Sequence, residues 1–266
     1  MTTRLVSFAN STIAVTYHGD LPAQIVDFLY RHISAIPNAP PPTLTYHLCG
    51  DEPDLLTLQR GDTLLYRGHS AAAAAILLLG DSGQALAASS QGGLLFHAAG
   101  LAQLGHGLLL PGPTGCGKST LAAWLLSRGL AYLSDELIFV ASGSVMLQGF
   151  TRPLNLKPPA RSILPADLDA PLFSTPYTDL VSPACTLNTA PLIQIIFPTY
   201  QPGGSFSLRP LSPARAGLAL MQCLLNARNL PDHGFAEISR LTRQAPAYQL
   251  DYGHFEQLQG WLESQP

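Results

Sequence analysis

Residues 112–120 read G-P-T-G-C-G-K-S-T, and their types and spacing indicate one particular chemistry. The stretch fits the pattern G-x-x-x-x-G-K-[ST], in which glycines let backbone N–H groups turn toward a polyphosphate. The lysine places a positive charge beside the terminal phosphates, and the hydroxyl can ligate Mg²⁺. The sequence therefore predicts a nucleotide site built from Gly112, Pro113, Thr114, Gly115, Cys116, Gly117, Lys118, Ser119 and Thr120.

The residues on either side of this loop predict the elements that must position it. Residues 107–111 form a short apolar run of strand type, and residues 121–128 are rich in good helix formers. Gly129 then stands where a helix C-terminus favours a left-handed residue. The order of strand, loop and helix is the context that the motif requires. It favours a phosphate site over the alternative, a glycine-rich turn between two core elements.

Two carboxylates follow the loop at a short distance in the sequence. Asp135 and Glu136 end an apolar run that begins at Leu130, and Asp135 follows Lys118 by 17 positions. Ligands in α/β proteins bind at the carboxyl ends of strands, and polyphosphate chemistry needs both a metal and a group that positions or deprotonates the nucleophile. We therefore expect this pair beside the loop. The alternative is a solvated strand end.

Three further side chains are candidates for the same site. His97 lies in an apolar run 21 positions before Lys118, where it is either a functional group or a hydrogen-bonded core histidine. Arg152 and Lys157 follow the carboxylate pair, and they either bind phosphate or an acidic substrate group or are surface cations.

His97, the loop and the Asp135-Glu136 pair together resemble the catalytic domain of HPr kinase/phosphorylase. In that family a His-Gly dipeptide precedes the phosphate loop, and an Asp-Asp pair follows an Arg-Gly turn and a short apolar strand. The present chain has Arg128-Gly129 and then Asp135-Glu136, and the resemblance covers roughly residues 92–160. It implies an α/β P-loop kinase core of the phosphoenolpyruvate carboxykinase type, with a mixed central sheet, and ATP-dependent phosphorylation of serine.

The resemblance also implies a role for each matching residue. Asp135 corresponds to the general base for the acceptor hydroxyl, His97 to an active-site histidine, and Lys118 to the lysine that holds the β- and γ-phosphates. Ser119 and the carboxylates of Asp135 and Glu136 correspond to groups that organise Mg²⁺. ATP and Mg²⁺ are therefore the implied cofactors.

Several positions differ from the family pattern. Ala98 follows the histidine in place of Gly, Thr120 replaces the usual Glu, and Glu136 replaces the second Asp. The family's later Gly-Arg-Asn segment is absent from the sequence. In these respects the chain is similar to the HPr-kinase-related proteins of peptide-modification clusters, including lasso-peptide precursor kinases. A peptide or small protein with a Ser or Thr is therefore the implied acceptor.

Composition excludes some classes of partner and leaves others open. The net charge is −3 and charged residues make up 12% of the chain, so no basic footprint for nucleic acid is expected. The longest apolar stretch, residues 71–79, is shorter than a membrane span, and no secretory signal is evident. Four scattered cysteines suit a reducing cytoplasm. Members of the HPr type are hexameric, so self-association into a homo-oligomer is a further expectation.

The pattern along the chain predicts two parts. Residues 1–90 read as a small α+β domain with strands near 4–9, 12–18, 43–48, 55–59 and 63–66, a helix over 21–33, and an alanine-rich helix over 71–89 broken at 80–83. Residues 91–266 read as the P-loop domain, with a hairpin over 136–150, a strand over 191–198, and helices over 213–229, 236–243 and 255–264. The proline-rich residues 151–190 are expected to form a lid.

Three functions remain in competition. The first is an ATP- and Mg²⁺-dependent kinase acting on a Ser or Thr hydroxyl of a peptide or small protein. The second is a kinase of the same type whose acceptor is a small metabolite. The third is a regulatory module that binds a nucleotide without transferring phosphate, and Asp135 argues against it because binding alone needs no base.

Overall fold

The structure is a computed structural model that describes residues 1–33, 36, 38–52, 55–156, 173–177, 180–183 and 185–263. It is a mixed α/β architecture with mixed sheets. Lys157 lies outside the described residues, as do residues 157–172, 178–179 and 184 of the expected lid over residues 151–190. The described residues of that range include a small three-stranded sheet.

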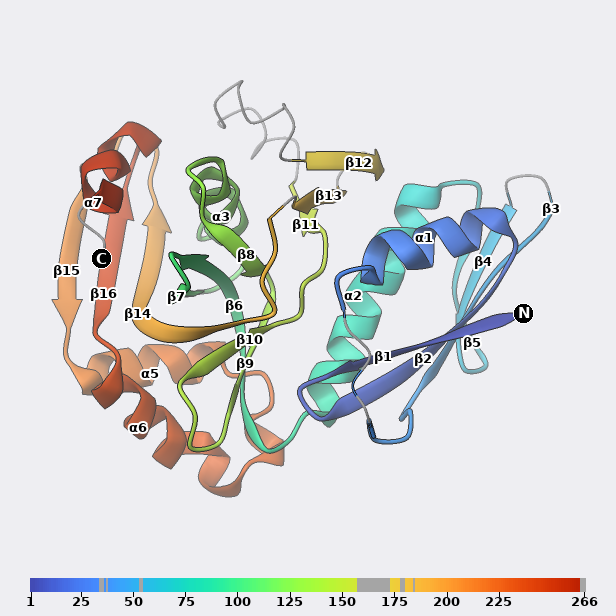
Figure 1. Cartoon of the computed structure of the whole chain (residues 1–266), viewed down its shortest axis with the longest axis horizontal. Coiled ribbons are helices and arrows are strands. Elements are labelled where there is room, and N and C mark those ends of the chain that lie inside the picture. The colour runs from blue at the N-terminus through green and yellow to red at the C-terminus, as the bar shows by residue number, and fades with distance from the viewer. Residues whose placement is uncertain are drawn as a thin grey trace.

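The first part of the chain forms a five-stranded sheet covered by two helices (Figure 1). The strands follow one another in sequence order, and only the β2–β3 pair is parallel. This arrangement confirms the strands and the first helix that the alternating and helical patterns predicted. The elements are β1 Thr2–Phe8, β2 Ser11–His18, α1 Asp20–Tyr30, β3 Thr45–Glu52, β4 Leu55–Arg60, β5 Thr63–Gly68 and α2 Ala71–Ser89.

Helix α2 is continuous, so the expected break at residues 80–83 was wrong. Glycine weakens a helix by about 1 kcal/mol relative to alanine, but tertiary contacts override such a preference. Two residues inside the expected break are held by other elements. The Asp81 carboxylate accepts hydrogen bonds from Tyr46 and Arg60, and the Ser82 hydroxyl pairs with the Tyr30 hydroxyl at 2.8 Å.

The continuity of α2 also changes the argument about membrane spans. Among the described residues, α2 is a helix long and apolar enough to cross a membrane by length and composition, with a mean hydropathy of 1.4. The expectation that the longest apolar stretch is too short therefore does not hold for the helix as a whole. A buried core helix passes the same test, and α2 packs against β2, β4 and α1.

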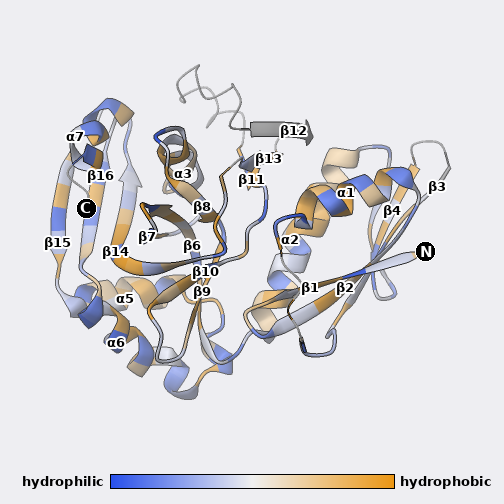
Figure 2. Cartoon of the chain, in the orientation of Figure 1, coloured by the Kyte–Doolittle hydropathy of each residue, from blue (hydrophilic) through white to orange (hydrophobic). Residues whose placement is uncertain are grey.

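The second part of the chain contains an eight-stranded mixed sheet. Its pairings run β10-β9-β6-β7-β14-β16-β15, with β8 beside β6. A further pairing of β10 with β14 closes five of these strands into a ring. Figure 2 shows hydrophobic residues along the inner strands β7 and β14. The strands are β6 Gly93–Gln103, β7 His106–Pro111, β8 Ala131–Ser134, β9 Leu137–Ala141, β10 Met146–Gly149, β14 Thr189–Tyr200, β15 Ser207–Leu211 and β16 Ala247–Tyr252.

Helices and a small sheet complete this part. The predicted hairpin is confirmed as β9 and β10, whereas β15 and β16 were not predicted. The helix expected over 213–229 ends at Cys223 and is followed by a separate 3₁₀ turn. The remaining elements are α3 Lys118–Ser127, β11 Leu154–Asn155, β12 Phe173–Tyr177, β13 Leu180–Pro183, α5 Pro213–Cys223, α6 Phe235–Gln244, α7 Gln259–Glu263 and 3₁₀ turns Ala227–Asn229, Pro231–Gly234 and Phe255–Leu258.

The two sheets pack against each other through a shared hydrophobic cluster. Phe8 of the first sheet contacts Phe139 and Phe150 of the second part, with ring centroids 6.4 Å and 5.3 Å apart. The same cluster includes Leu95 and Leu137 together with the buried face of α2. The chain passes from the first part to the second between Ser89 and Gly93, but the hydrophobic core continues from one part into the other. The first part is therefore positioned firmly beside the second.

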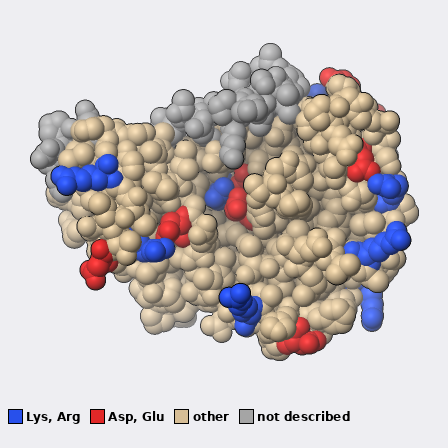
Figure 3. All heavy atoms as spheres, turned by 180° about the vertical axis from the view of Figure 1, so that it is seen from behind, with Lys and Arg blue, Asp and Glu red and all other residues tan. Residues whose placement is uncertain are grey.

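A buried asparagine secures the connection between the two parts. The Asn226 side chain is 2% exposed and lies between the C-terminal segment and the start of β6. Its amide nitrogen donates to the Ser90 and Gly93 carbonyls, and its oxygen accepts from the Leu95 N–H at 3.0 Å. Figure 3 shows few charged side chains on one face of the molecule, with acidic and basic atoms together in a hollow near its middle.

Candidate functional site

The predicted phosphate loop connects β7 to α3, as its sequence context indicated. Gly115 and Gly117 adopt φ values of +88° and +97°, which L side chains rarely adopt. The helix begins with a hydrogen bond from the Leu121 N–H to the Gly117 carbonyl at 2.8 Å. At the other end, Gly129 is left-handed with φ +93°, as predicted. The sequence therefore encodes both ends of α3 locally.

Close packing beneath the loop explains two of its glycines. A Cβ atom added to Gly112 would lie 2.7 Å from the Cys116 sulfur. A Cβ atom added to Gly117 would lie 3.1 Å from the Tyr200 Cβ and 3.3 Å from the Tyr252 hydroxyl. The loop therefore has a shape that only residues without side chains allow at these positions.

Lys118 lies inside the loop with its ammonium group bonded to backbone. Its Nζ donates to the Gly112 carbonyl at 2.6 Å and the Pro113 carbonyl at 2.9 Å, and the residue is 6% exposed. Its third contact is with the Cys116 sulfur at 4.0 Å, and sulfur is a weak acceptor that a phosphate oxygen can replace. The charge is thus held in place before any phosphate arrives.

The first turn of α3 fits an anion as well. Gly117 stands at the N-cap position and has no side chain, so it makes no capping hydrogen bond to the N–H groups of that turn. Free N–H groups and the helix dipole favour phosphate at such an end. Pro113, Thr114 and Gly115 are exposed, Ser119 is half-buried, and Thr120 is buried. The exposed residues form the accessible rim of the loop.

The carboxylate pair lies in the turn between β8 and β9, which Ser134 organises. Its hydroxyl donates to the Phe150 carbonyl at 2.8 Å and accepts from the N–H groups of Glu136 and Leu137. Ser134 is fully buried, so these bonds attach the turn to the residues that follow β10. The backbone between the two carboxylates is fixed as a result.

Strand β6 brings the separate motifs together because it lies between β7 and β9. In its ladder with β7, Ala98 is opposite Pro111, the last residue before the loop. In its ladder with β9, His97 is opposite Leu137, the residue after Glu136. The sheet therefore places the histidine beside both the phosphate loop and the carboxylates.

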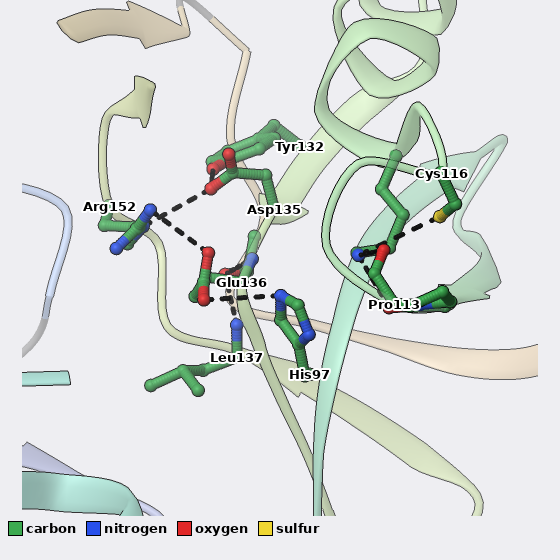
Figure 4. Close-up of polar contacts among 11 residues, drawn as sticks. His97, Pro113, Cys116, Tyr132, Asp135, Glu136, Leu137 and Arg152 are labelled. Carbon is green, nitrogen blue, oxygen red and sulfur yellow. Dashed lines mark hydrogen bonds and ion pairs between the residues drawn. The ribbon is translucent and has the colours of Figure 1, made fainter. Parts of the chain in front are cut away.

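Arg152 joins the two carboxylates in an ion-pair network (Figure 4). Its Nε lies 3.3 Å from Asp135 Oδ1, and a terminal nitrogen lies 3.4 Å from Glu136 Oε2. The Tyr132 hydroxyl donates to Asp135 Oδ1 at 3.0 Å, and His97 Nε2 lies 3.4 Å from Glu136 Oε1. The network therefore extends from the buried Tyr132 to His97, next to the loop.

The two carboxylates of this network differ in solvent exposure. The side chain of Asp135 is only 1% exposed, whereas that of Glu136 is 41% exposed. Asp135 is thus enclosed by Tyr132 and Arg152 in this structure. Glu136 is the carboxylate that an incoming ligand meets first.

The network sets the charge state of its members. Burial lowers the pKa of Arg152, but the carboxylates of Asp135 and Glu136 outweigh burial and raise it above its ordinary value. Burial, with the charge of Asp135, raises the pKa of the Tyr132 hydroxyl well above its ordinary value. Burial and then the charge of Lys118 lower the pKa of His97, against the carboxylates. Arg152 is therefore charged, Tyr132 is a hydrogen-bond donor, and His97 tends toward its neutral form.

A pocket of about 570 Å³ opens beside the network. Four of the predicted site residues line it: Thr114, His97, Glu136 and Arg152. Its other walls include Leu137, Asn155 and one face of α2. Asp135 is not among the described residues that line the pocket, because Arg152 and Tyr132 cover it.

Sequence reasoning missed several residues of this site. Tyr132 and Ser134 precede the carboxylates on the same strand, and their roles depend on contacts that residue spacing does not reveal. Cys223 at the end of α5 is buried, and burial raises the pKa of its thiol while the charge of Lys118 opposes that effect. Arg152 was predicted to bind phosphate or substrate, and in this structure it binds the carboxylates. Lys157 lies outside the described residues.

Comparison with known proteins found no family model that matches the chain and no curated protein that matches it. The resemblance to HPr kinase therefore remains a prediction that depends on the motifs themselves.

Proposed function

We propose that the chain is an ATP- and Mg²⁺-dependent kinase that transfers the γ-phosphate to a Ser or Thr hydroxyl of a peptide or small protein. One observation carries the proposal. Thr114 of the phosphate loop lines the same pocket as His97, Glu136 and Arg152. A phosphate donor at the loop and an acceptor in the pocket would therefore be adjacent, which phosphoryl transfer requires.

The loop residues fit a nucleotide. The Lys118 ammonium group, whose weak contact with the Cys116 sulfur a phosphate oxygen could replace, and the N–H groups at the start of α3 would hold the β- and γ-phosphates. When bound, ATP would supply the phosphoryl group that is transferred. Lys118 and the loop N–H groups would then meet the negative charge that spreads over that group.

The residues for Mg²⁺ fit a metal that arrives with the nucleotide. Among the residues that the structure describes, no group of three or more His, Cys, Asp or Glu side chains could hold a metal ion. Protein-bound Mg²⁺ commonly uses one or two carboxylates, several waters and the phosphates themselves. Ser119, Asp135 and Glu136 are the proposed protein ligands, and Glu136 is the more exposed carboxylate.

Asp135 is the proposed base for the acceptor hydroxyl, and Arg152 is the group that controls its access. In this structure the guanidinium covers Asp135 Oδ1. Phosphate oxygens are strong competing acceptors for a guanidinium. We infer that a bound polyphosphate would draw Arg152 toward it and free Asp135 to take the hydroxyl proton.

Replacement of Asp135 by Asn tests this assignment. We expect Asp135→Asn to lower the transfer rate at least about 100-fold, the usual contribution of a general base, while affinity for ATP in the absence of Mg²⁺ changes little. Phosphate incorporation from labelled ATP and calorimetric titration with ATP measure the two quantities. Asp251→Asn, at an ion pair outside the site, is the matched control. Full transfer by Asp135→Asn would show that another group is the base.

A small-metabolite acceptor is the second candidate, and the volume of the pocket is compatible with it as well as with a peptide acceptor. Cavities of about 300–1,000 Å³ suit small ligands, and this pocket lies within that range. Parallel assays with hydroxyl metabolites and with Ser or Thr peptides would separate the two acceptor classes. ATP binding without labelling of any acceptor would instead favour a regulatory module.

A further inference from the structure

The pocket beside the phosphate loop has two chemically different kinds of lining. Its charged side chains include Glu136 and Arg152, which are paired with each other. Its apolar lining comes largely from α2, with contributions from Leu137, Leu180 and Leu225. The first part of the chain therefore completes a pocket whose reactive groups all belong to the second part.

The wall from α2 is one face of that helix. Its pocket-lining residues recur every three or four positions, which is the helical repeat, and they include Ile76, Leu79, Gly80, Gly83 and Ala87. A Cβ atom added to Gly80 would have nothing within 4 Å. The space over Gly80 is thus open, and a side chain from outside the protein would contact Ile76 and Leu79 there.

Two amide side chains belong to the same pocket lining. They are those of Gln84 of α2 and Asn155 of β11. A primary amide both donates and accepts hydrogen bonds, so it matches the alternating N–H and C=O groups of a peptide backbone. The pocket therefore offers groups for a hydroxyl, for a main chain and for an apolar side chain.

We propose that α2 provides a specificity subsite that binds an aliphatic side chain directly next to the phosphorylated Ser or Thr of a peptide acceptor. The proposal rests on the proposed kinase function. Burial of an aliphatic group against this wall stabilises the complex, whereas burial of an unpaired charge there is unfavourable. Glu136 and Arg152 are paired with each other in this structure and in the proposed complex would be engaged by Mg²⁺ and the polyphosphate, so they offer an acidic or basic neighbour no partner.

Serine peptides that differ in one flanking residue test the subsite. The probes are short synthetic peptides with Leu, Ala or Glu on either side of a single Ser. We expect the preference on one side of the Ser only. On that side, the peptide with Leu should exceed the peptide with Glu at least about tenfold in kcat/KM, within the usual range for an apolar pocket. Fluorescence anisotropy of labelled peptides, with ATP analogue bound, measures the same preference without any transfer.

Gly80→Leu fills the proposed subsite from the helix itself. Leucine is a better helix former than glycine, and its Cβ atom would have no other atom within 4 Å, so the variant should fold and bind ATP normally. We expect it to reduce affinity for the Leu peptide at least about tenfold and to remove the preference over the Ala peptide. Gly260→Leu is the matched control, because it lies in helix α7 and also has no atom within 4 Å of the added Cβ.

Two results would overturn the subsite. One is equal binding of the Leu, Ala and Glu peptides to the unmodified protein. The other is a Gly80→Leu variant that keeps the full preference for leucine. Failure of the kinase proposal gives a different result, since no peptide would then be phosphorylated while selective binding in the anisotropy assay would persist.

Discussion

Arg152 Nε lies 3.3 Å from Asp135 Oδ1, and both side chains are almost completely buried, with 9% and 1% of their surfaces exposed. A buried ion pair contributes little compared with an apolar pair, but removal of one partner leaves an uncompensated charge. The pair therefore constrains both the stability of the protein and the availability of its predicted base.

Arg152→Ala should lower the free energy of unfolding by about 3–5 kcal/mol, because Asp135 then remains buried without its cation. Urea unfolding followed by circular dichroism measures this loss. The matched control is Arg209→Ala, which breaks an ion pair whose arginine is 65% exposed and should change stability by less than about 1 kcal/mol. Removal of both partners in Arg152→Ala/Asp135→Ala should restore part of the loss, and an equal loss in the double variant would contradict the pairing.

Asn226→Ala should destabilise the protein by about 2–4 kcal/mol, because buried groups near residues 90–95 lose their partners. Thermal and urea unfolding give the size of the effect. Asn229→Ala is the control, because Asn229 donates to Ala88 and Ser90 but is exposed, so water can replace it. Similar losses for both variants would argue against a special role for the buried asparagine.

Gly117→Ala should abolish nucleotide binding while the rest of the chain remains folded. The added methyl group would meet Tyr200 and Tyr252 at a φ of +97° that alanine rarely adopts. Gly105→Ala, in the β6–β7 turn, has a similar φ of +85° but no atom within 4 Å of the added Cβ. The control should therefore share the backbone strain and retain ATP affinity, as measured by calorimetry. Normal binding by Gly117→Ala would exclude the loop as the phosphate site.

Deprotonation of Cys223 should lower the free energy of unfolding as the pH rises above 9.0, the ordinary pKa of a thiol. Burial raises the pKa of its thiol from the ordinary 9.0, so the folded protein keeps this proton to higher pH than the unfolded chain does. Above that pH the unfolded state releases the proton first and is favoured. Urea unfolding at about pH 8 and about pH 10 should show a steeper loss for the unmodified protein than for Cys223→Ala.

Chemical labelling checks the same cysteine independently. Exposed Cys185 should react with iodoacetamide in the folded protein, whereas buried Cys223 should react only after unfolding. Rapid labelling of Cys223 in the folded state would contradict both its burial and the expected pH dependence.

The features that the sequence predicted are those whose causes are local. The phosphate loop, the start of α3 and the left-handed Gly129 all follow from residues within a few positions of one another. The β9–β10 hairpin is similarly local. Strand β16 was missed because its partner β14 lies far away in the sequence, and pairing with β14 gives β16 its conformation.

For the same reason, the spacing of residues in the sequence could not predict the contacts around the two carboxylates. Asp135 was predicted from its sequence distance to Lys118, but its enclosure depends on the meeting of two segments, the one that holds Tyr132 and Asp135 and the one that holds Arg152. The break expected in α2 was wrong because glycine preference is a local effect, whereas Asp81 and Ser82 are held by neighbouring strands and α1. Local conformational preferences predicted most helices and strands, whereas tertiary contacts determined the continuity of α2 and the surroundings of Asp135.

The β6–β7 hairpin fixes the distance between His97 and the phosphate loop. The β6–β7 ladder ends at the pair of Ala98 and Pro111, so His97 and the phosphate loop both lie directly beyond its last pair, and the register of the ladder sets the separation between them. Side chains alternate between the two faces of a strand, so a shift of the register by one residue would turn the histidine to the other face. The length of the turn at Leu104 and Gly105 is therefore as important for the geometry of the candidate site as the side chains themselves.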